Sequence, residues 1–466
     1  MSVKKLHRRN FLKMMCIGTA DLGFGMVTPN VIGKTTNGML VESPNEYGGF
    51  LVEKLYGTKG KKRAYDSDPD IVKPLSEKMT VFSRNVWDPV RQDRPSENLV
   101  YDRMVTGKGK NSNQTRLDYA LMVGSWTIAN GGGASSYHWE SHGQAGRRPF
   151  REMGPWDPAD IDMTWEQVTL AVKHAALFYG ASLVGIAEVQ PWHIYSEIYQ
   201  PTRENRERTI PVIRDTAKFG KTDEAYYIPR SINRVIAVAF EEDFYGIANS
   251  PGQLASAATG NQYSRMAFTA PCIAEFLRVL GYKAIPSGNG LGPSIAVAIE
   301  AGLGELGRNG LIVTPKYGPR VRLAKIYTDM PLIPDPQIRF GVPEFCESCM
   351  MCADKCPSES ISHGHRTWKG KSISNNPGFY KWYIQPETCY DYNGFSCSNC
   401  KRVCPFTKPN NSWLHRMIRA VIKRRIKPAN NMMVTLDRAS GYGRQLPDTE
   451  FWKMDGNRSI TSRESM

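Results

Sequence analysis

Eight of the ten cysteines lie between residues 346 and 404, and this clustering limits what the chain can fold into. The first group is the run C-E-S-C-M-M-C-A-D-K-C-P, and a proline also follows the last cysteine of the second group. Closely spaced thiolates followed by C-P are typical ligands of an iron–sulfur centre. The eight residues are Cys346, Cys349, Cys352, Cys356, Cys389, Cys397, Cys400 and Cys404.

The first run has the C-x2-C-x2-C-x3-C-P spacing of bacterial ferredoxins, in which three thiolates bind one cubane and the fourth binds the other. We therefore predict two [4Fe–4S] clusters. The longer gap between Cys389 and Cys397 leaves the first ligand of the second group open. The predicted ligand sets are Cys346, Cys349, Cys352 and Cys404 for cluster 1, and Cys356, Cys389, Cys397 and Cys400 for cluster 2.

Two zinc sites and a disulfide network are the alternatives to iron–sulfur clusters. Zinc sites usually use C-x2-C pairs separated by a longer loop, which these triplets do not match. Disulfides would need a dense network in one short segment. A chain of 466 residues can bury a hydrophobic core and does not need such covalent cross-links to fold. Cys16 and Cys272 are not expected to be ligands. Two clusters relay single electrons, so the sequence predicts a redox-active protein.

The N-terminus carries the export pattern Arg8-Arg9-Asn10-Phe11-Leu12-Lys13, followed by a modestly apolar stretch that Asp21 and glycines interrupt. This stretch is a poor transmembrane candidate, and a basic amphipathic helix is the alternative to a signal. The twin-arginine route exports folded, cofactor-loaded proteins, which suits clusters built in the cytosol. We therefore expect residues 1–33 to be a twin-arginine signal peptide.

The remaining charge is still strongly positive. The leader carries five Lys/Arg against one Asp, so its removal lowers the net charge from +15 to about +11. Such a field favours an anionic membrane surface or an acidic partner. Because no recognition motif accompanies the charge, no nucleic-acid partner is expected.

Hydrophobic periodicity predicts an α/β domain at residues 164–335, after an aromatic-rich segment at 34–163 that wraps the core or caps a pocket. In such a domain, ligands sit on loops at the carboxyl ends of strands. Residues 336–410 form the cluster segment, and 411–466 a basic segment that contacts the core, a partner or a membrane. We expect helices at 165–177, 264–280 and 293–301, and strands at 181–187, 234–240, 283–286, 311–314 and 321–327.

A glycine-rich loop, S-G-N-G-L-G, follows the strand expected at 283–286. Its glycines do not have the G-x-G-x-x-G spacing of a dinucleotide site. A loop that lets backbone amides approach a large cofactor is the better interpretation.

The chain resembles the respiratory reductive dehalogenases over nearly its whole length. The resemblance rests on the leader, the stretch from Tyr263 to P-S-G-N-G-L-G, the blocks A-G-L-G-E-L-G-R-N-G and K-Y-G-P-R-V-R-L, and both cluster motifs. It implies an open, nitroreductase-like α/β core that binds a corrinoid, joined to the two-cluster segment. The chain lacks D-x-H-x-x-G, the motif by which some proteins ligate cobalt through histidine, so a base-off corrinoid without a histidine ligand is expected.

The implied reaction is RX + 2e⁻ + H⁺ → RH + X⁻, with electrons relayed by the clusters to the cobalt. A tyrosine suits the proton donor because its phenol is protonated at neutral pH, and a guanidinium would stabilise the phenolate. The resemblance assigns Tyr263 as the donor, Asn289 as its companion and Arg322 as the guanidinium, with Arg308 as the rival and Arg320 a weaker one. The residues expected to bind the corrinoid are Ser287, Gly288, Asn289, Gly290 and Arg308.

Members of this family use a small organohalide, a small membrane-anchor protein and an upstream membrane electron donor such as a quinol. The resemblance therefore implies a peripheral protein on the outer face of the cytoplasmic membrane, with a homodimer expected by analogy. One alternative is an epoxyqueuosine-reductase-like enzyme, against which the leader counts. A non-catalytic two-cluster electron-transfer subunit is another, although it leaves the α/β domain without a function.

Overall fold

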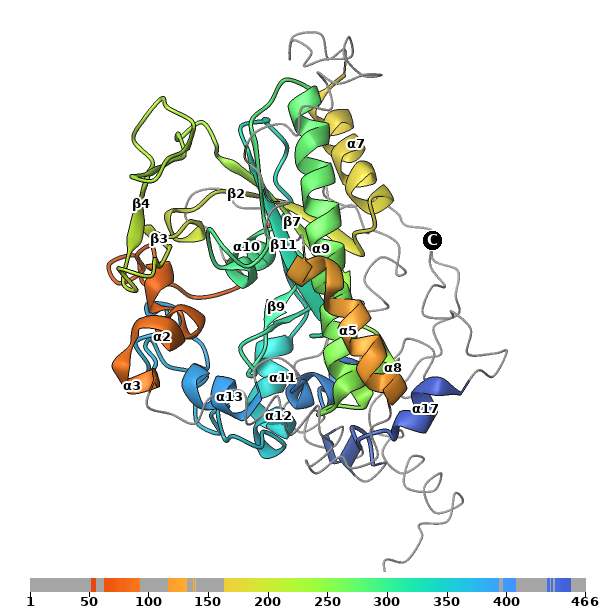
Figure 1. Cartoon of the computed structure of the whole chain (residues 1–466). Helices are drawn as coiled ribbons and strands as arrows, with labels where there is room; N and C mark the ends of the chain where they lie inside the picture. The colour runs from red at the N-terminus through yellow and green to blue at the C-terminus, as the bar shows by residue number, and fades with distance from the viewer. Residues whose placement is uncertain are drawn as a thin grey trace, which may run out of the picture. The chain divides into compact units, whose positions relative to one another are not determined.

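The computed structural model describes residues 52–55, 63–92, 116–131, 137, 139, 163–393, 397–407, 434–435, 437–438 and 441–453 (Figure 1). By its contacts the chain divides into Met1–Glu46 and Tyr47–Met466. The predicted signal peptide and most of the basic C-terminal segment lie outside the described residues. Within the described part, no helix is both long and apolar enough to cross a membrane. The other predicted domain boundaries stay predictions.

The centre of the fold is a four-stranded sheet in the order β2-β7-β11-β8, with every neighbouring pair antiparallel. The mixed α/β class predicted from the sequence is confirmed. The pairing adds that β7 and β8 run in one direction with β11 between them, so the carboxyl ends of β7 and β8 and the amino end of β11 share an edge. The strands are β2 Leu183–Glu188, β7 Arg234–Glu241, β8 Ala284–Ser287 and β11 Val321–Thr328.

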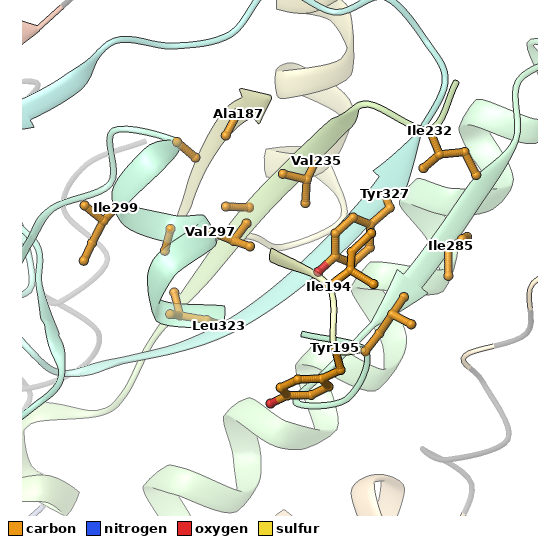
Figure 2. Close-up of a cluster of buried hydrophobic side chains, with 14 of the residues drawn as sticks. Ala187, Ile194, Tyr195, Ile232, Val235, Ile285, Val297, Ile299, Leu323 and Tyr327 are labelled. Carbon is orange, nitrogen blue, oxygen red and sulfur yellow. The ribbon is translucent and has the colours of Figure 1, made fainter. Parts of the chain in front are cut away.

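Both faces of this sheet are buried, which explains the continuous apolar sequence R-V-I-A-V-A-F of β7. Val235, Ala237 and Ala239 face a core cluster that contains α10 (Ser294–Glu300), since alternate side chains of a strand point to opposite faces. Figure 2 shows part of this cluster, in which Val297 of α10 lies with Val235, Leu323 and Tyr327 of the strands. The intervening residues of β7 face α7 (Trp165–Phe178) and α9 (Gln253–Val279).

The helix α7 begins where the sequence predicts, because Thr164 and Gln167 form a reciprocal capping box. In contrast, α9 begins eleven residues before the expected residue 264. Its first turns, Q-L-A-S-A-A-T-G, are small and polar and show no apolar periodicity. They are buried because α5 (Arg116–Gly131) packs on them, and a Cβ at Gly260 would lie 2.5 Å from the Trp126 ring.

The cluster segment packs on a third group of buried side chains, which includes Phe340, Phe345, Val403 and Phe406. Smaller paired strands complete the fold. The strands are β1 Glu53–Leu55 with β12 Gln337–Arg339, β9 Glu305–Leu306 with β10 Ile312–Val313, and β3 Glu197–Tyr199, β4 Thr209–Ile213, β6 Tyr226–Tyr227 and β5 Gly220–Lys221. The remaining helices are η1 Glu77–Met79, α2 Val81–Trp87, α3 Pro89–Gln92, η3 Pro191–His193, α8 Phe244–Ala248, α11 Val342–Cys349, α12 Met351–Asp354, α13 Pro386–Asn393, α14 Asn399–Arg402, η4 Pro405–Thr407 and α17 Asp448–Trp452.

Candidate active site

Three of the predicted site residues, each from a different element, meet at the shared edge of the sheet. Asn289, in the loop after β8, donates a hydrogen bond from Nδ2 to the Tyr263 hydroxyl at 2.8 Å. Arg322, near the start of β11, places its guanidinium carbon 4.6 Å from the centre of the Tyr263 ring. The ring itself stacks on Trp126, with centroids 5.1 Å apart and an interplanar angle of 26°. The phenol is thus held between an amide and a cation.

The pleat of β11 explains why Arg322 reaches Tyr263. Ala324 and Ile326 face the layer of α7 and α9, so Arg322 shares this face, and Tyr263 is a residue of α9. The register pairs Arg322 with Phe240, which leaves the next residue on the same face of that strand, Glu242, beside the guanidinium. The sequence spacing alone does not reveal this neighbour.

The other two candidate arginines are engaged elsewhere. Arg320 forms an ion pair with Glu241 at 3.1 Å and donates to the Thr407 carbonyl at 3.2 Å. Arg308 donates from Nε to the Cys346 carbonyl at 3.0 Å and from Nη1 to two further carbonyls, and it stacks over a tryptophan ring. Of the three arginines, Arg322 is therefore the one placed over the Tyr263 ring. The predicted contact of Arg308 with a corrinoid stays a prediction.

Tyr263 and Asn289 line a cavity of about 410 Å³, within the range of roughly 300–1,000 Å³ that is usual for small-molecule sites. Four aromatic side chains contribute to its walls, and the glycine-rich loop forms one side. A Cβ at Gly290 would come no closer than 3.6 Å to another atom, an ordinary contact with the Glu77 carboxylate, so a methyl group fits there without displacing a neighbour. The lining includes Glu77, Tyr137, Trp139, Tyr226, Tyr263, Met266, Ser287, Gly288, Asn289 and Gly290.

A buried lysine of the neighbouring strand β11 holds this loop by hydrogen bonds. Lys325 is fully buried on β11 and donates from Nζ to the Gly288 carbonyl at 2.7 Å and to the Ser294 hydroxyl at 2.9 Å. Ser287 closes the loop by donating to the Gly290 carbonyl at 2.7 Å. Burial lowers the pKa of Lys325 to about 7, with the Glu77 carboxylate acting in the opposite direction. No sequence motif points to this lysine.

The four cysteines predicted for cluster 1 line one small cavity together with Arg308. The helix α11 ends at Cys349, and Met350 then adopts the left-handed conformation with φ 53°, an uncommon choice for a non-glycine residue. The chain reverses there, and α12 carries Cys352 back to the same cavity. Local backbone geometry thus gathers the thiols that the sequence spacing predicts.

The four cysteines predicted for cluster 2 also lie near one another. Burial raises the pKa of Cys400, and the neighbouring thiols Cys397, Cys389 and Cys356 raise it further. Burial followed by Cys397 and Cys356 raises the pKa of Cys389 to about 11. Each of these thiols therefore lies within electrostatic range of others of its set, and Cys400 is also within range of Cys352 and Cys404 of the other set. Cys389, the ligand that the sequence left open, lies in this group.

Comparison with known proteins assigns the chain to a family. Residues 345–407 match the family model described as a 4Fe-4S double cluster binding domain. The tetrachloroethene reductive dehalogenase of Sulfurospirillum multivorans is 36% identical over 363 residues, which cover 74% of this chain and 72% of that protein. The chain belongs to the reductive dehalogenase family. It is therefore an oxidoreductase acting on carbon–halogen bonds, as its motifs predict.

Solved structures share the fold of this reductive dehalogenase. One, described as suggesting a mechanism for B12-dependent dehalogenation, is 19% identical, with a TM-score of 0.57 over 86% of this chain and 50% of its own. A catabolic reductive dehalogenase in complex with 3-bromo-4-hydroxybenzoic acid has a TM-score of 0.55 at 19% identity and covers 82% of this chain and 48% of its own. The chain thus spans about half the length of these two.

The epoxyqueuosine-reductase alternative has a weaker match. The epoxyqueuosine reductase of Lactococcus garvieae is 30% identical over 128 residues, which cover 26% of this chain and 34% of that protein. The match to reductive dehalogenases is both longer and more similar. The non-catalytic electron-transfer alternative is wrong, because the family to which the chain belongs consists of reductive dehalogenases, which are enzymes.

Proposed function

We propose that this reductive dehalogenase is corrinoid-dependent and replaces a halogen of a small organohalide by hydrogen, according to RX + 2e⁻ + H⁺ → RH + X⁻. The observation that carries the proposal is the convergence of Tyr263, Asn289 and Arg322 beside a cavity and next to the two-cluster segment. The reaction needs a proton at the carbon, a means of placing the substrate, and two electrons. The chain supplies a group for each need.

Tyr263 is the proposed proton donor. Tyr263 lines the cavity, and a phenol is in general protonated at neutral pH and so can transfer a proton to a carbon that has gained electrons. Asn289 orients this hydroxyl: since its amide donates to the phenol oxygen, the phenol proton stays free to face the cavity. The stacked Trp126 fixes the ring in the same direction.

Arg322 is proposed to stabilise the phenolate that remains after the proton has left. A fixed cation beside a group that gains negative charge costs little reorganisation during the reaction, which is why such charges are effective in a largely dry site. Arg322 cannot itself supply the proton, because a guanidinium keeps its protons at neutral pH. Proton transfer and charge stabilisation are therefore separate tasks of Tyr263 and Arg322.

The cavity fits part of a corrinoid. Four aromatic side chains contribute to its walls, and Gly288 and Gly290 of the loop line it without side chains of their own. A bound corrinoid would supply the low-valent cobalt that reduces the carbon–halogen bond. Ser287, Gly288, Asn289 and Gly290 would hold it through their backbone, and Lys325 would keep that loop in place. A base-off form without a histidine ligand is part of the proposal.

The two cysteine sets are proposed to hold the [4Fe–4S] clusters that deliver electrons singly. Cluster 2 would be the closer to the catalytic pair, since Cys400 and Arg322 lie near enough for their charges to interact. Cluster 1 would lie beside Arg308, whose guanidinium is held against the carbonyl of Cys346. Electrons would then pass from cluster 1 through cluster 2 to the cavity.

The remaining expectations belong to the same proposal. Export would follow from Arg8-Arg9, and the partners would be a membrane-anchor protein and an upstream quinol or other donor. The active form would be a homodimer on the outer face of the membrane. For substrates, the named relatives act on tetrachloroethene, and one solved chain binds a brominated hydroxybenzoate. We propose chlorinated ethenes first and halogenated aromatics second.

The test is anaerobic turnover of a halocarbon panel that includes tetrachloroethene, with reduced methyl viologen as donor and protein loaded with corrinoid and iron–sulfide. Halide release that depends on bound cobalt supports the proposal. A protein with about eight irons for two cubanes that binds no corrinoid would overturn it. Activity toward an epoxyqueuosine substrate but not toward any halocarbon would favour the alternative reductase.

A further inference from the structure

A buried carboxylate links the catalytic pair to the cluster segment. Glu242 follows β7, and its side chain is entirely shielded from solvent. One oxygen, Oε1, lies 3.3 Å from Nε of Arg322 and accepts a hydrogen bond from the Thr259 hydroxyl at 3.1 Å. The other oxygen, Oε2, accepts a hydrogen bond from Nζ of Lys401. Both oxygens are therefore engaged.

The two cations that meet at Glu242 come from different parts of the protein. Arg322 belongs to the central sheet, whereas Lys401 lies on α14 and directly follows the predicted cluster ligand Cys400. The Lys401 side chain is also nearly sealed from solvent, with 7% exposed. Burying such charges is unfavourable unless they are paired. Apolar side chains of similar size often stabilise a purely structural contact at least as well as a buried ion pair does. The arrangement therefore suggests a function.

The position of Glu242 determines how Arg322 is presented. The carboxylate approaches the guanidinium at Nε as an ion pair at 3.3 Å, and Nε makes no hydrogen bond of its own within the described part of the chain. Arg322 is 27% exposed, so its outer side reaches the region of the Tyr263 ring. Because the ion pair lies at Nε, the carboxylate fixes the guanidinium without covering the face that lies over the Tyr263 ring.

We propose that Glu242 is a positioning residue of the dehalogenase: it holds Arg322 over Tyr263 and, through Lys401, sets the charge beside the predicted cluster 2. This inference rests on the proposed function and adds a residue that the family motifs do not indicate. Without the carboxylate, Arg322 would lose its fixed orientation. In addition, the positive charge of Lys401 would no longer be balanced, which would favour the reduced, more negative state of the neighbouring cluster.

The test compares Glu242→Gln with Glu241→Gln in cluster- and corrinoid-loaded protein. The control carboxylate is adjacent in sequence but pairs with Arg320 rather than with Arg322 or Lys401. We expect Glu242→Gln to lower kcat about 10- to 100-fold with KM nearly unchanged. A loss of this size is typical when a residue that orients a directly acting group is removed. An EPR redox titration should show the potential of one cluster shifted to less negative values. Glu241→Gln should change neither quantity.

Two further variants separate charge from shape. Glu242→Asp keeps the charge but is one methylene shorter, so the cluster potential should stay close to that of the wild type while kcat still falls. If Glu242→Gln fails to retain iron, the double variant Glu242→Gln with Lys401→Met also removes the unpaired ammonium beside Cys400, so that Arg322 is the one cation of the original three-residue network that remains. This double variant should bind a full complement of iron and still show the loss of kcat.

Wild-type kcat and an unchanged potential in Glu242→Gln, or wild-type kcat in the double variant, would overturn the inference. Failure of the proposed function has a different signature, because the wild-type protein would then release no halide from any compound. The redox titration requires no turnover, so it tests the effect of Glu242 on the cluster in that case as well.

Discussion

Replacing Tyr263 by phenylalanine removes a single oxygen from the candidate site and leaves the ring. The lost hydroxyl is the atom to which Asn289 donates at 2.8 Å. The contacts of the ring with Trp126 and Arg322 do not depend on that oxygen, since they involve the aromatic face. The variant therefore tests proton donation with little disturbance of packing.

The expected effects on stability and on activity differ widely. One neutral hydrogen bond contributes about 1 kcal/mol to the free energy of unfolding, and the amide of Asn289 lies at the cavity, where water can replace the lost partner. A positioned general acid contributes roughly 10²- to 10⁴-fold to the rate. We thus expect Tyr263→Phe to remain folded and loaded with cofactors, to keep KM within about threefold, and to lose at least about 100-fold in kcat.

Tyr137→Phe is the matched control, because Tyr137 lines the same cavity and burial raises the pKa of its phenol, which makes it a poor acid. Chloride release from tetrachloroethene, driven by reduced methyl viologen, is measured for both variants together with their iron and cobalt contents. If Tyr263→Phe releases chloride within about threefold of the wild-type rate, Tyr263 is not the proton donor. Loss of activity in Tyr137→Phe alone would move that role to Tyr137.

Three further predictions concern the loop, the buried lysine and the clusters. Gly292→Ala should lower the thermal unfolding midpoint and reduce the free energy of unfolding by about 1–3 kcal/mol, because its Cβ would lie 2.0 Å from a carbonyl oxygen of η3. Gly290→Ala should unfold like the wild type but retain less corrinoid. Burial lowers the pKa of Lys325 from 10.5 to about 7 in the folded protein, so the unfolded chain binds more protons between these values and stability should rise with pH across that window. Lys325→Met should remove this rise, as measured by the free energy of unfolding at several pH values. If the free energy of unfolding rises equally with pH in the variant and the wild type, Lys325 is not its cause. Cys404→Ala should lower iron content from about eight to about four per chain, while Cys272→Ala, within α9, should keep all of it.

The local parts of this protein follow from its sequence. The cysteine spacing predicts which thiols meet, because ligands a few residues apart are brought together by a single turn of backbone, here the left-handed Met350. The capping box at Thr164 and the apolar run of β7 likewise predict the start of α7 and a fully buried strand. The motifs shared with reductive dehalogenases also select Tyr263, Asn289 and Arg322 as one group.

Other features depend on residues that are distant in the chain. The early start of α9 escaped prediction because its small residues become a packing surface only when α5 lies against them. The resemblance favoured Arg322 over its rival Arg308, but no sequence feature shows which of the two lies beside Tyr263. Their hydrogen-bond partners separate them, with Arg308 held at a cluster cysteine and Arg322 over the Tyr263 ring.

The sequence by itself therefore determined the main elements and the family of this reductive dehalogenase, and it predicts the two cysteine ligand groups. Only the tertiary structure decided how β7, β11 and α14 bring Glu242, Arg322 and Lys401 into one buried charge network. A side chain's partners across a sheet depend on strand order and register, and residues 242, 322 and 401 have no mutual spacing that a motif could record. Burial then makes their charges interact strongly, because little water remains between them to screen the field.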